Sequence, residues 1–133
     1  MRRIDFATTA TANVMLKTKC IYETAAADDG YRVLVDRLWP RGLTKEKAAI
    51  DLWAKAISPS DELRRWVKQG SERFEEFAVR YALELTTPEK KLLLDDLRNR
   101  ARKGAVTLLF AHRNEAQNNA TVLADVLMRK SKR

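Results

Sequence analysis

Two short apolar runs limit the folds open to this chain more than any other feature. They are YRVLV at 31–35, which is apolar at its centre, and AVTLLF at 105–110. A strand with solvent on one face alternates apolar and polar residues, whereas a strand covered on both faces is apolar along its length. We therefore predict that both runs are covered strands, as in a parallel sheet.

Two further segments are predicted as strands and five as helices. KTKCIYE at 17–23 alternates polar and apolar residues, and IDLWAKAI at 50–57 is ambiguous but stops at Ser58-Pro59, which suits a strand. The helical segments open on N-cap or first-turn residues. They are predicted at 44–49, 60–70, 71–85 and 87–104, with a last helix that starts at Asn114.

This order of elements predicts an α/β protein. We expect a mainly parallel sheet of four strands, or slightly more, flanked by helices in a Rossmann-like three-layer arrangement. A chain of 133 residues suits a single domain. We expect a flexible leader at 1–16, the α/β domain at 17–128 and a basic tail at 129–133.

The charge balance allows a nucleic-acid partner but does not favour one. The chain has 26 Lys and Arg residues against 18 Asp and Glu, a net charge of +8, and basic proteins often bind nucleic acid. Much of the excess, however, lies in Arg2, Arg3 and the tail at 129–133. No apolar run is long enough to span a bilayer, so we expect no membrane association.

Cysteine and glycine usage argues against several site classes. Cys20 is the only cysteine and cannot form an internal disulfide, which favours a reducing, cytoplasmic location. Cys20 and the single histidine, His112, are too few for a closed four-ligand zinc site. The chain also lacks a glycine-rich phosphate loop and a nucleophile elbow. We therefore predict no metal and no cofactor.

Polar side chains follow each of the two covered strands. The first loop is DRLWPRG at 36–42, and the second is AHRNEAQNNA at 111–120. In open parallel sheets, ligands bind outside the carboxyl ends of the strands, where loops and helix N-termini meet. If the two strands are neighbours, the loops open on the same edge, and their arginines face a helix N-terminus. That combination suits phosphate or carboxylate.

The first loop offers five candidate residues, and most have a structural alternative. Asp36 could be a general base, a carboxylate that orients an arginine, or a partner in a structural salt bridge. Arg37 and Arg41 could supply positive charge to a ligand, and Gly42 places Arg41 in a tight turn. Trp39 could be a stacking platform, although Trp-Pro is more often a hydrophobic plug at a corner.

The second loop offers five more. His112 could act as an acid or base near neutral pH, or be an incidental loop residue, and Arg113 could bind an anion. Asn114, with Gln117 three residues later, resembles a capping box that starts the last helix. Asn118 and Asn119 could donate to a ligand, or be a local cap and an amide bonded to backbone.

Four blocks of this sequence resemble a known family. DGYRVLVDRLWPRG, LWAKAISPSDELRRW, FEEFAVRYALEL and VTLLFAHRNEAQNNATVLADVL are similar to the YeaO-like branch of the domain of unknown function 488 (DUF488) family, and they span about 17–128. The resemblance implies a compact α/β domain of bacterial, cytoplasmic type, with no established activity. More distant members carry DVR...P after the second strand and LLC...CHR at the last one.

This chain lacks a cysteine at the positions where those distant members carry one. Phe110 stands where they have a cysteine, and Asn118 and Asn119 stand near their Cys-His pair. A thiol nucleophile or thiol-bound metal therefore cannot operate here. We expect a small anionic ligand, with a nucleotide as one candidate, at the carboxyl edge of the sheet, and the sequence allows hydrolase or transferase chemistry without requiring it. The alternative is a nucleic-acid-binding accessory or regulatory protein. The sequence does not indicate an oligomeric state.

Overall fold

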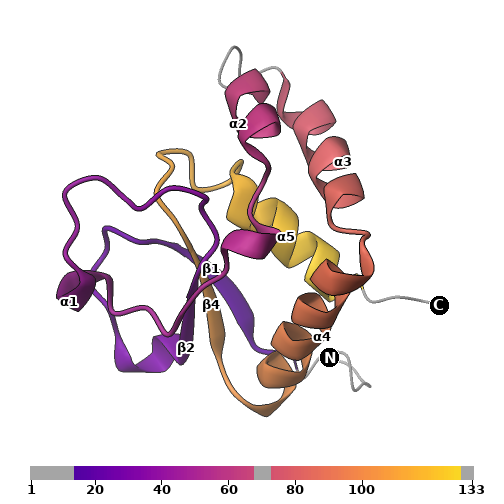
Figure 1. The fold of residues 1–133 in the computed structure, drawn as a ribbon. Coiled ribbons are helices and arrows are strands. Elements are labelled where there is room, and N and C mark those ends of the chain that lie inside the picture. The colour runs from indigo at the N-terminus through magenta and orange to yellow at the C-terminus, as the bar shows by residue number, and fades with distance from the viewer. Residues whose placement is uncertain (1–13, 68–72, 130–133) are drawn as a thin grey trace.

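A parallel four-stranded sheet forms the centre of the computed structural model, which describes residues 14–67 and 73–129 (Figure 1). The strand order is β1-β4-β2-β3, and every neighbouring pair is parallel. The strands are β1 (Leu16–Cys20), β2 (Tyr31–Leu34), β3 (Leu52–Trp53) and β4 (Val106–Phe110). The predicted α/β fold with a parallel sheet is therefore confirmed, and the two covered strands are its central pair.

Alternation along the central strands divides the core into two parts. In β2 and just after it, Val33 and Val35 face the larger apolar cluster, whereas Leu34 faces a smaller one. In β4, Val106 and Leu108 belong to the larger cluster and Leu109 to the smaller. Successive side chains of a strand point to opposite faces, so both runs are apolar because both faces are covered.

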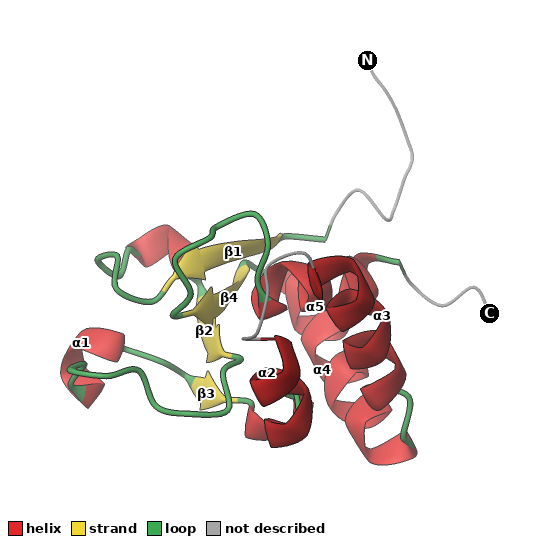
Figure 2. Cartoon of the chain, turned by 90° about the horizontal axis from the view of Figure 1, so that it is seen from above, coloured by secondary structure: helices red, strands yellow, loops and turns green. Residues whose placement is uncertain are grey.

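Helices lie on both faces of the sheet, and most of them lie on one. In the described part of the chain they are α1 (Lys45–Ala48), α2 (Asp61–Val67), α3 (Phe74–Glu84), α4 (Pro88–Lys103) and α5 (Asn119–Met128). The larger apolar cluster contains buried side chains from α2 through α5. Figure 2 shows these four helices on one side of the sheet and α1 on the other. No helix in the described residues is long and apolar enough to cross a membrane.

The opposite face has a thinner cover, made by α1 and the chain on either side of it. Trp39, Leu43 and Ile50 pack here against buried Leu34 and Leu109. The two flanks of the sheet are thus unequal, with four helices on one face and a short helix with long connections on the other. The carboxyl edge of the sheet, where the loops at 36–43 and 111–118 begin, lies between these covers.

Helix starts agree with the predicted caps at three places. The side chain of Thr44 accepts a hydrogen bond from the amide of Lys47, Ser60 accepts from Leu63, and Thr87 accepts from Lys90. Each hydroxyl satisfies an amide that has no partner within its helix. The predicted end of a helix at Gly70 and the cap at Ser71 lie outside the described residues.

Two predicted elements were wrong in detail. The strand predicted at 50–57 is limited to Leu52–Trp53, and the chain then turns into a 3-10 helix at Lys55–Ile57. This turn is fixed by Ser58, whose amide and hydroxyl both donate to the carbonyl of Lys55. The last helix starts at Asn119, five residues after the predicted start at Asn114.

Candidate anion site at the carboxyl edge of the sheet

Asp36 joins the loops that follow the two central strands. One carboxylate oxygen accepts a hydrogen bond from the amide of Ala111 at 3.0 Å, and the other accepts from the side-chain amide of Asn119 at 2.9 Å. The same Asn119 nitrogen donates to the carbonyl of Val35 at 2.8 Å. We call this set of contacts the Asp36 clamp. It confirms that the two loops meet at one edge of the sheet.

The remaining strands are tied to the same edge by two aromatic side chains. The indole nitrogen of Trp53, in β3, donates to the carbonyl of Asp36 at 2.8 Å. The hydroxyl of Tyr22, just after β1, donates to the carbonyl of Arg41 at 2.8 Å. Sequence reasoning did not identify Tyr22 as a site residue. Its position immediately after a strand of a parallel sheet was the available signal, because all such positions share one edge.

Burial controls the ionisation of Asp36. The low-polarity surroundings raise the pKa of its carboxyl above the ordinary value, and this outweighs the hydrogen bonds from Asn119 and Ala111 and the nearby His112, which act in the opposite direction. A raised pKa in the folded state means that ionisation of Asp36 opposes folding. The stability contributed by Asp36 therefore falls as the pH rises from its ordinary pKa through the raised one.

We expect Asp36→Ala to lower the free energy of unfolding by about 2 kcal/mol, because the amides of Ala111 and Asn119 lose a charged acceptor. Urea unfolding near neutral pH measures this loss. The control is Asp28→Ala. The side chain of Asp28 is 86% exposed, and its ion pair with Lys17 is long at 3.8 Å. This variant should lower the free energy of unfolding by less than about 0.5 kcal/mol. Equal losses in the two variants would show that the Asp36 clamp does not hold the edge together.

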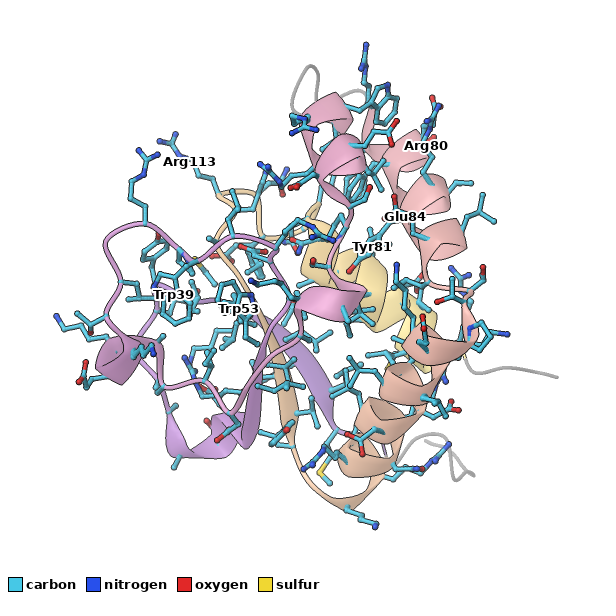
Figure 3. The ribbon with its side chains drawn as sticks, in the orientation of Figure 1. Trp39, Trp53, Arg80, Tyr81, Glu84 and Arg113 are labelled. Carbon is cyan, nitrogen blue, oxygen red and sulfur yellow. The ribbon has the colours of Figure 1, made fainter. Side chains whose placement is uncertain are left out.

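The three candidate arginines do not behave alike. The guanidinium group of Arg37 donates to the carbonyl of Pro59 at 3.0 Å and lies 4.0 Å from Asp61, so it ties the first loop to α2. Arg41 and Arg113 are exposed, and within 14–67 and 73–129 their guanidinium groups have no hydrogen-bond or ion-pair partner. Arg113 extends away from the body of the protein in Figure 3. Only Arg41 and Arg113 are available to a ligand.

Trp39 packs into the smaller apolar cluster and has a structural role. Its indole nitrogen donates to the carbonyl of Leu43 at 2.7 Å, and its ring meets that of Trp53 edge-on, with centroids 5.3 Å apart (Figure 3). Gly42 has a positive φ of 75°, a backbone conformation that favours glycine. The turn that carries Arg41 is thus fixed by the contacts of Trp39 and by the backbone of Gly42.

In the second loop, most polar groups bond the loop itself. The Nδ1 atom of the exposed His112 accepts from the amide of Asn114. The side chain of Asn114 accepts from the amides of Ala116 and Gln117, so it closes a turn instead of capping a helix. Asn118 is the N-cap of α5, in a reciprocal capping box with Thr121.

The asparagines therefore have structural partners. Asn118 is buried and also donates to the carbonyl of Asn114 at 2.9 Å, and Asn119 belongs to the Asp36 clamp. The structure brings Asp36 and Asn119 into contact, and it leaves Arg41, His112 and Arg113 exposed on the connected loops. Ligand binding by these residues stays a prediction.

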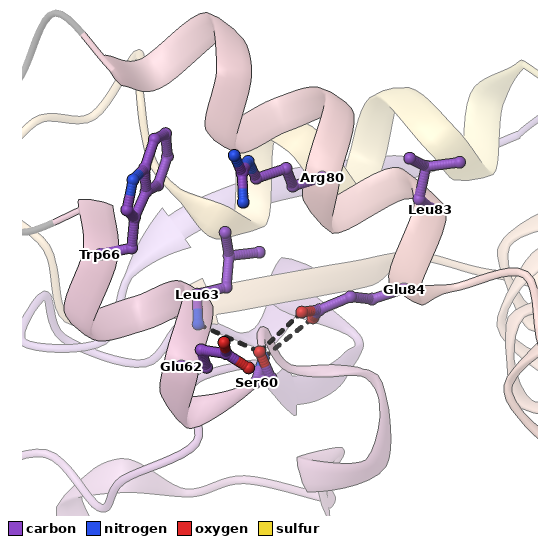
Figure 4. Close-up of a pocket in the computed structure, with 7 residues that line it drawn as sticks. All are labelled: Ser60, Glu62, Leu63, Trp66, Arg80, Leu83 and Glu84. Carbon is purple, nitrogen blue, oxygen red and sulfur yellow. Dashed lines mark hydrogen bonds between the residues drawn. The ribbon is translucent and has the colours of Figure 1, made fainter.

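A cavity of about 250 Å³ lies apart from these loops, between α2 and α3 (Figure 4). Both carboxylate oxygens of Glu84 accept from Ser60, at 2.6 Å from the hydroxyl and 2.9 Å from the amide. The buried Tyr81 donates to the carbonyl of Ile57, and its pKa is raised by burial and by the charges of Asp36 and Glu84. These contacts attach α3 to the segment before α2, and the cavity contains no predicted site residue.

The end of β4 carries no nucleophilic side chain, and the cysteine at this edge is Cys20, which pairs in register with Phe110. Phe110, at the end of β4, is 1% exposed and packs in the larger apolar cluster. Cys20, the only cysteine, ends β1 and is partly buried. In the described residues, no group of three or more His, Cys, Asp or Glu side chains is arranged to hold a metal ion.

Comparisons with known proteins give one matching family and several uncharacterized relatives. The profile described as "Inactive DUF488-N3 subclade" matches residues 15–133. An uncharacterized Escherichia coli protein, YeaO, is 42% identical over 113 residues, which cover 84% of this chain and 96% of YeaO. An uncharacterized Mycobacterium tuberculosis protein, Rv3073c, is 43% identical over 107 residues, covering 80% of this chain and 88% of the relative. No solved structure matched the chain.

Proposed function

Since this chain belongs to the family described as the inactive DUF488-N3 subclade, we propose that it is a binding protein without catalytic activity. Its ligand would be a small anion that carries phosphate or carboxylate, bound at the carboxyl edge of the sheet. The observation that carries this proposal is that the guanidinium groups of Arg41 and Arg113 have no partner among the described residues, although they stand on two loops joined by the Asp36 clamp.

The contacts of Asp36 support binding over catalysis. Each oxygen of Asp36 accepts one hydrogen bond from the protein, so the carboxylate has a structural role in holding the two loops together. The position that carries a cysteine in more distant members is occupied here by the buried Phe110. The exposed arginines at this edge can attract an anion, and the end of β4 offers no nucleophile in place of that cysteine.

The available cations suit an oxyanion. A guanidinium group can donate two parallel hydrogen bonds to phosphate or carboxylate. The backbone of Arg41 is restrained by Tyr22 and by the turn at Gly42, which reduces the entropy lost when its side chain binds. The first turn of α5 begins at the same edge, with its positive dipole end toward the loops.

A nucleic-acid partner has less support. On α4, Arg98 and Arg100 form ion pairs with Asp95 and Asp96, at 2.8 and 3.0 Å. Arg98 also donates to the carbonyls of Leu127 and Val126 near the end of α5. These arginines are therefore engaged within the protein. Most of the basic tail lies outside the described residues.

We expect pyrophosphate to stabilise the wild-type protein in a thermal-shift titration and to bind Arg41→Ala about tenfold more weakly, the equivalent of one charge-assisted hydrogen bond. Arg113→Ala should show a similar loss. The matched control is Arg102→Ala, which removes an exposed arginine on α4 that contacts Asn99 and should leave the affinity unchanged. Equal stabilisation of all four proteins would place the anion elsewhere and contradict the proposal.

A further inference from the structure

A groove between α3 and α5 forms a second surface, separate from the anion site. Its volume is about 640 Å³, and its lining is mostly apolar, with Ala78, Val79 and Leu83 from α3 and Val122 and Val126 from α5. Large exposed apolar side chains that gather in one place usually mark a contact surface. Val79 is 61% exposed and Leu83 is 65% exposed, and both stand at the edge of this groove.

The outer stripe of α3 is a ridge that could enter such a groove. Glu75, Val79 and Leu83 are spaced by four residues, so they lie in one line along the helix. The apolar residues of this ridge, Val79 and Leu83, thus lie along one wall of the groove. A surface that carries both a ridge and a groove can complement itself when two copies face each other across a two-fold axis.

Charge sets the direction in which two copies would pair. Figure 1 shows α3 and α5 running in the same direction from the upper part of the molecule. Glu75 and Glu76 are exposed in the first turn of α3, and Glu76 pairs with Arg80 at 2.6 Å, whereas Glu75 has no side-chain partner among the described residues. At the other end of the groove, Arg129 follows α5 and pairs with Asp125 at 2.8 Å. A two-fold axis that places the copies antiparallel brings the unpaired Glu75 of each copy to Arg129 of its partner.

We propose that the α3–α5 surface is the interface of a two-fold symmetric homodimer, in which the Val79–Leu83 ridge of each copy occupies the groove of the other. In this arrangement Glu75 of one copy faces Arg129 of the other, and the contact occurs twice. The proposal does not depend on anion binding, because none of the predicted site residues lines the groove.

Sedimentation equilibrium of the wild-type chain from about 1 to about 100 µM tests the proposal, because a dimer gains population by mass action over this range. We expect Val79→Glu to raise the dimer dissociation constant at least about a hundredfold, since the new carboxylate would be buried without a partner. The matched control is Leu92→Glu on α4, at a residue 73% exposed and outside the groove. It should leave the dimer intact, and circular dichroism checks that both variants fold.

Charge reversal tests the antiparallel direction. Glu75→Arg and Arg129→Glu should each weaken the dimer about tenfold, and the double variant should recover most of the affinity because the pair is restored in the opposite sense. A wild-type chain that stays monomeric across the whole range overturns the homodimer, and so does a dimer that survives Val79→Glu. Failure of the double variant to recover overturns the antiparallel pairing.

Discussion

Gly30→Ala is expected to lower the free energy of unfolding by about 3 to 5 kcal/mol, because the change combines backbone strain with a steric clash. Gly30 leads into β2 with a positive φ of 66° and a ψ of −129°, a region that residues with a side chain rarely adopt. A Cβ atom at this position would lie 2.2 Å from the carbonyl oxygen of Ala105. That oxygen accepts a hydrogen bond from the backbone amide of Tyr31. It therefore cannot move away without weakening the pairing of β2 with β4.

A second glycine separates the two contributions to this loss. Gly42 also has a positive φ, of 75°, but a Cβ added there would meet nothing within 4 Å. Gly42→Ala should therefore show only the cost of the backbone conformation, about 1 kcal/mol. Urea unfolding of both variants gives the comparison. If Gly30→Ala costs no more than Gly42→Ala, the close approach of Gly30 to Ala105 is not a feature of the folded protein.

The sequence was most informative where one local pattern has one physical solution. The runs at 31–35 and 105–110 could be apolar on both faces only if both faces were covered, and they became the central pair of strands. The sequence Asp28-Asp29-Gly30 directly before β2 is typical of a turn, and Gly30 there has a positive φ. Hydroxyl caps at Thr44, Ser60 and Thr87 located three helix starts correctly.

The start of α5 shows where local signals compete. Asn114 with Gln117, and Asn118 with Thr121, both place an asparagine three residues before a polar side chain. The second pair forms the cap. The hydroxyl of Thr121 accepts a hydrogen bond from the backbone amide of Asn118, and the side chain of Asn118 accepts one from the backbone amide of Thr121. The local sequence favours the first pair, because a capping box usually has Glu or Gln at the third helical position. The deciding contact is Asn119, the next residue, which must reach Val35 and Asp36 across the sheet.

The candidate site depended on contacts between distant parts of the chain. Adjacent strands could be anticipated, and the two loops do meet. The role of Asp36 could not be read from its neighbours, because its partners Ala111 and Asn119 are 75 and 83 residues away along the chain. Likewise, Arg37 donates to the carbonyl of Pro59, which lies 22 residues later in the sequence, just before α2. Only the tertiary structure shows that the guanidinium group of Arg37 is bonded within the protein, whereas, within the part of the chain that it describes, those of Arg41 and Arg113 are free to bind a ligand.

Substitution of Asp29 is the second change that we expect to lower the stability of the protein strongly. Its side chain is fully buried and accepts hydrogen bonds from the side chains of Arg32 and Lys19 and from the amide of Ala26. The side chain of Arg32 is only 5% exposed. Asp29→Ala should lower the free energy of unfolding by about 3 to 5 kcal/mol, because it leaves a buried guanidinium group without its counter-charge. The neighbouring Asp28→Ala, at a side chain 86% exposed, is the matched control for urea unfolding.

The pH dependence of stability provides an independent test of the same cluster. Burial alone would raise the pKa of Asp29, but the hydrogen bonds from Ala26, Lys19, Lys17 and Arg32 outweigh it and hold the pKa well below its usual range. The stability that Asp29 contributes is therefore complete above the ordinary carboxyl pKa and is lost as the pH falls toward the lowered one. Below about pH 4, the wild type should lose stability more steeply than Asp29→Asn, which has no carboxyl group to titrate. Parallel acid-unfolding curves for the two proteins would mean that the Asp29 carboxylate is not ion-paired in the folded state.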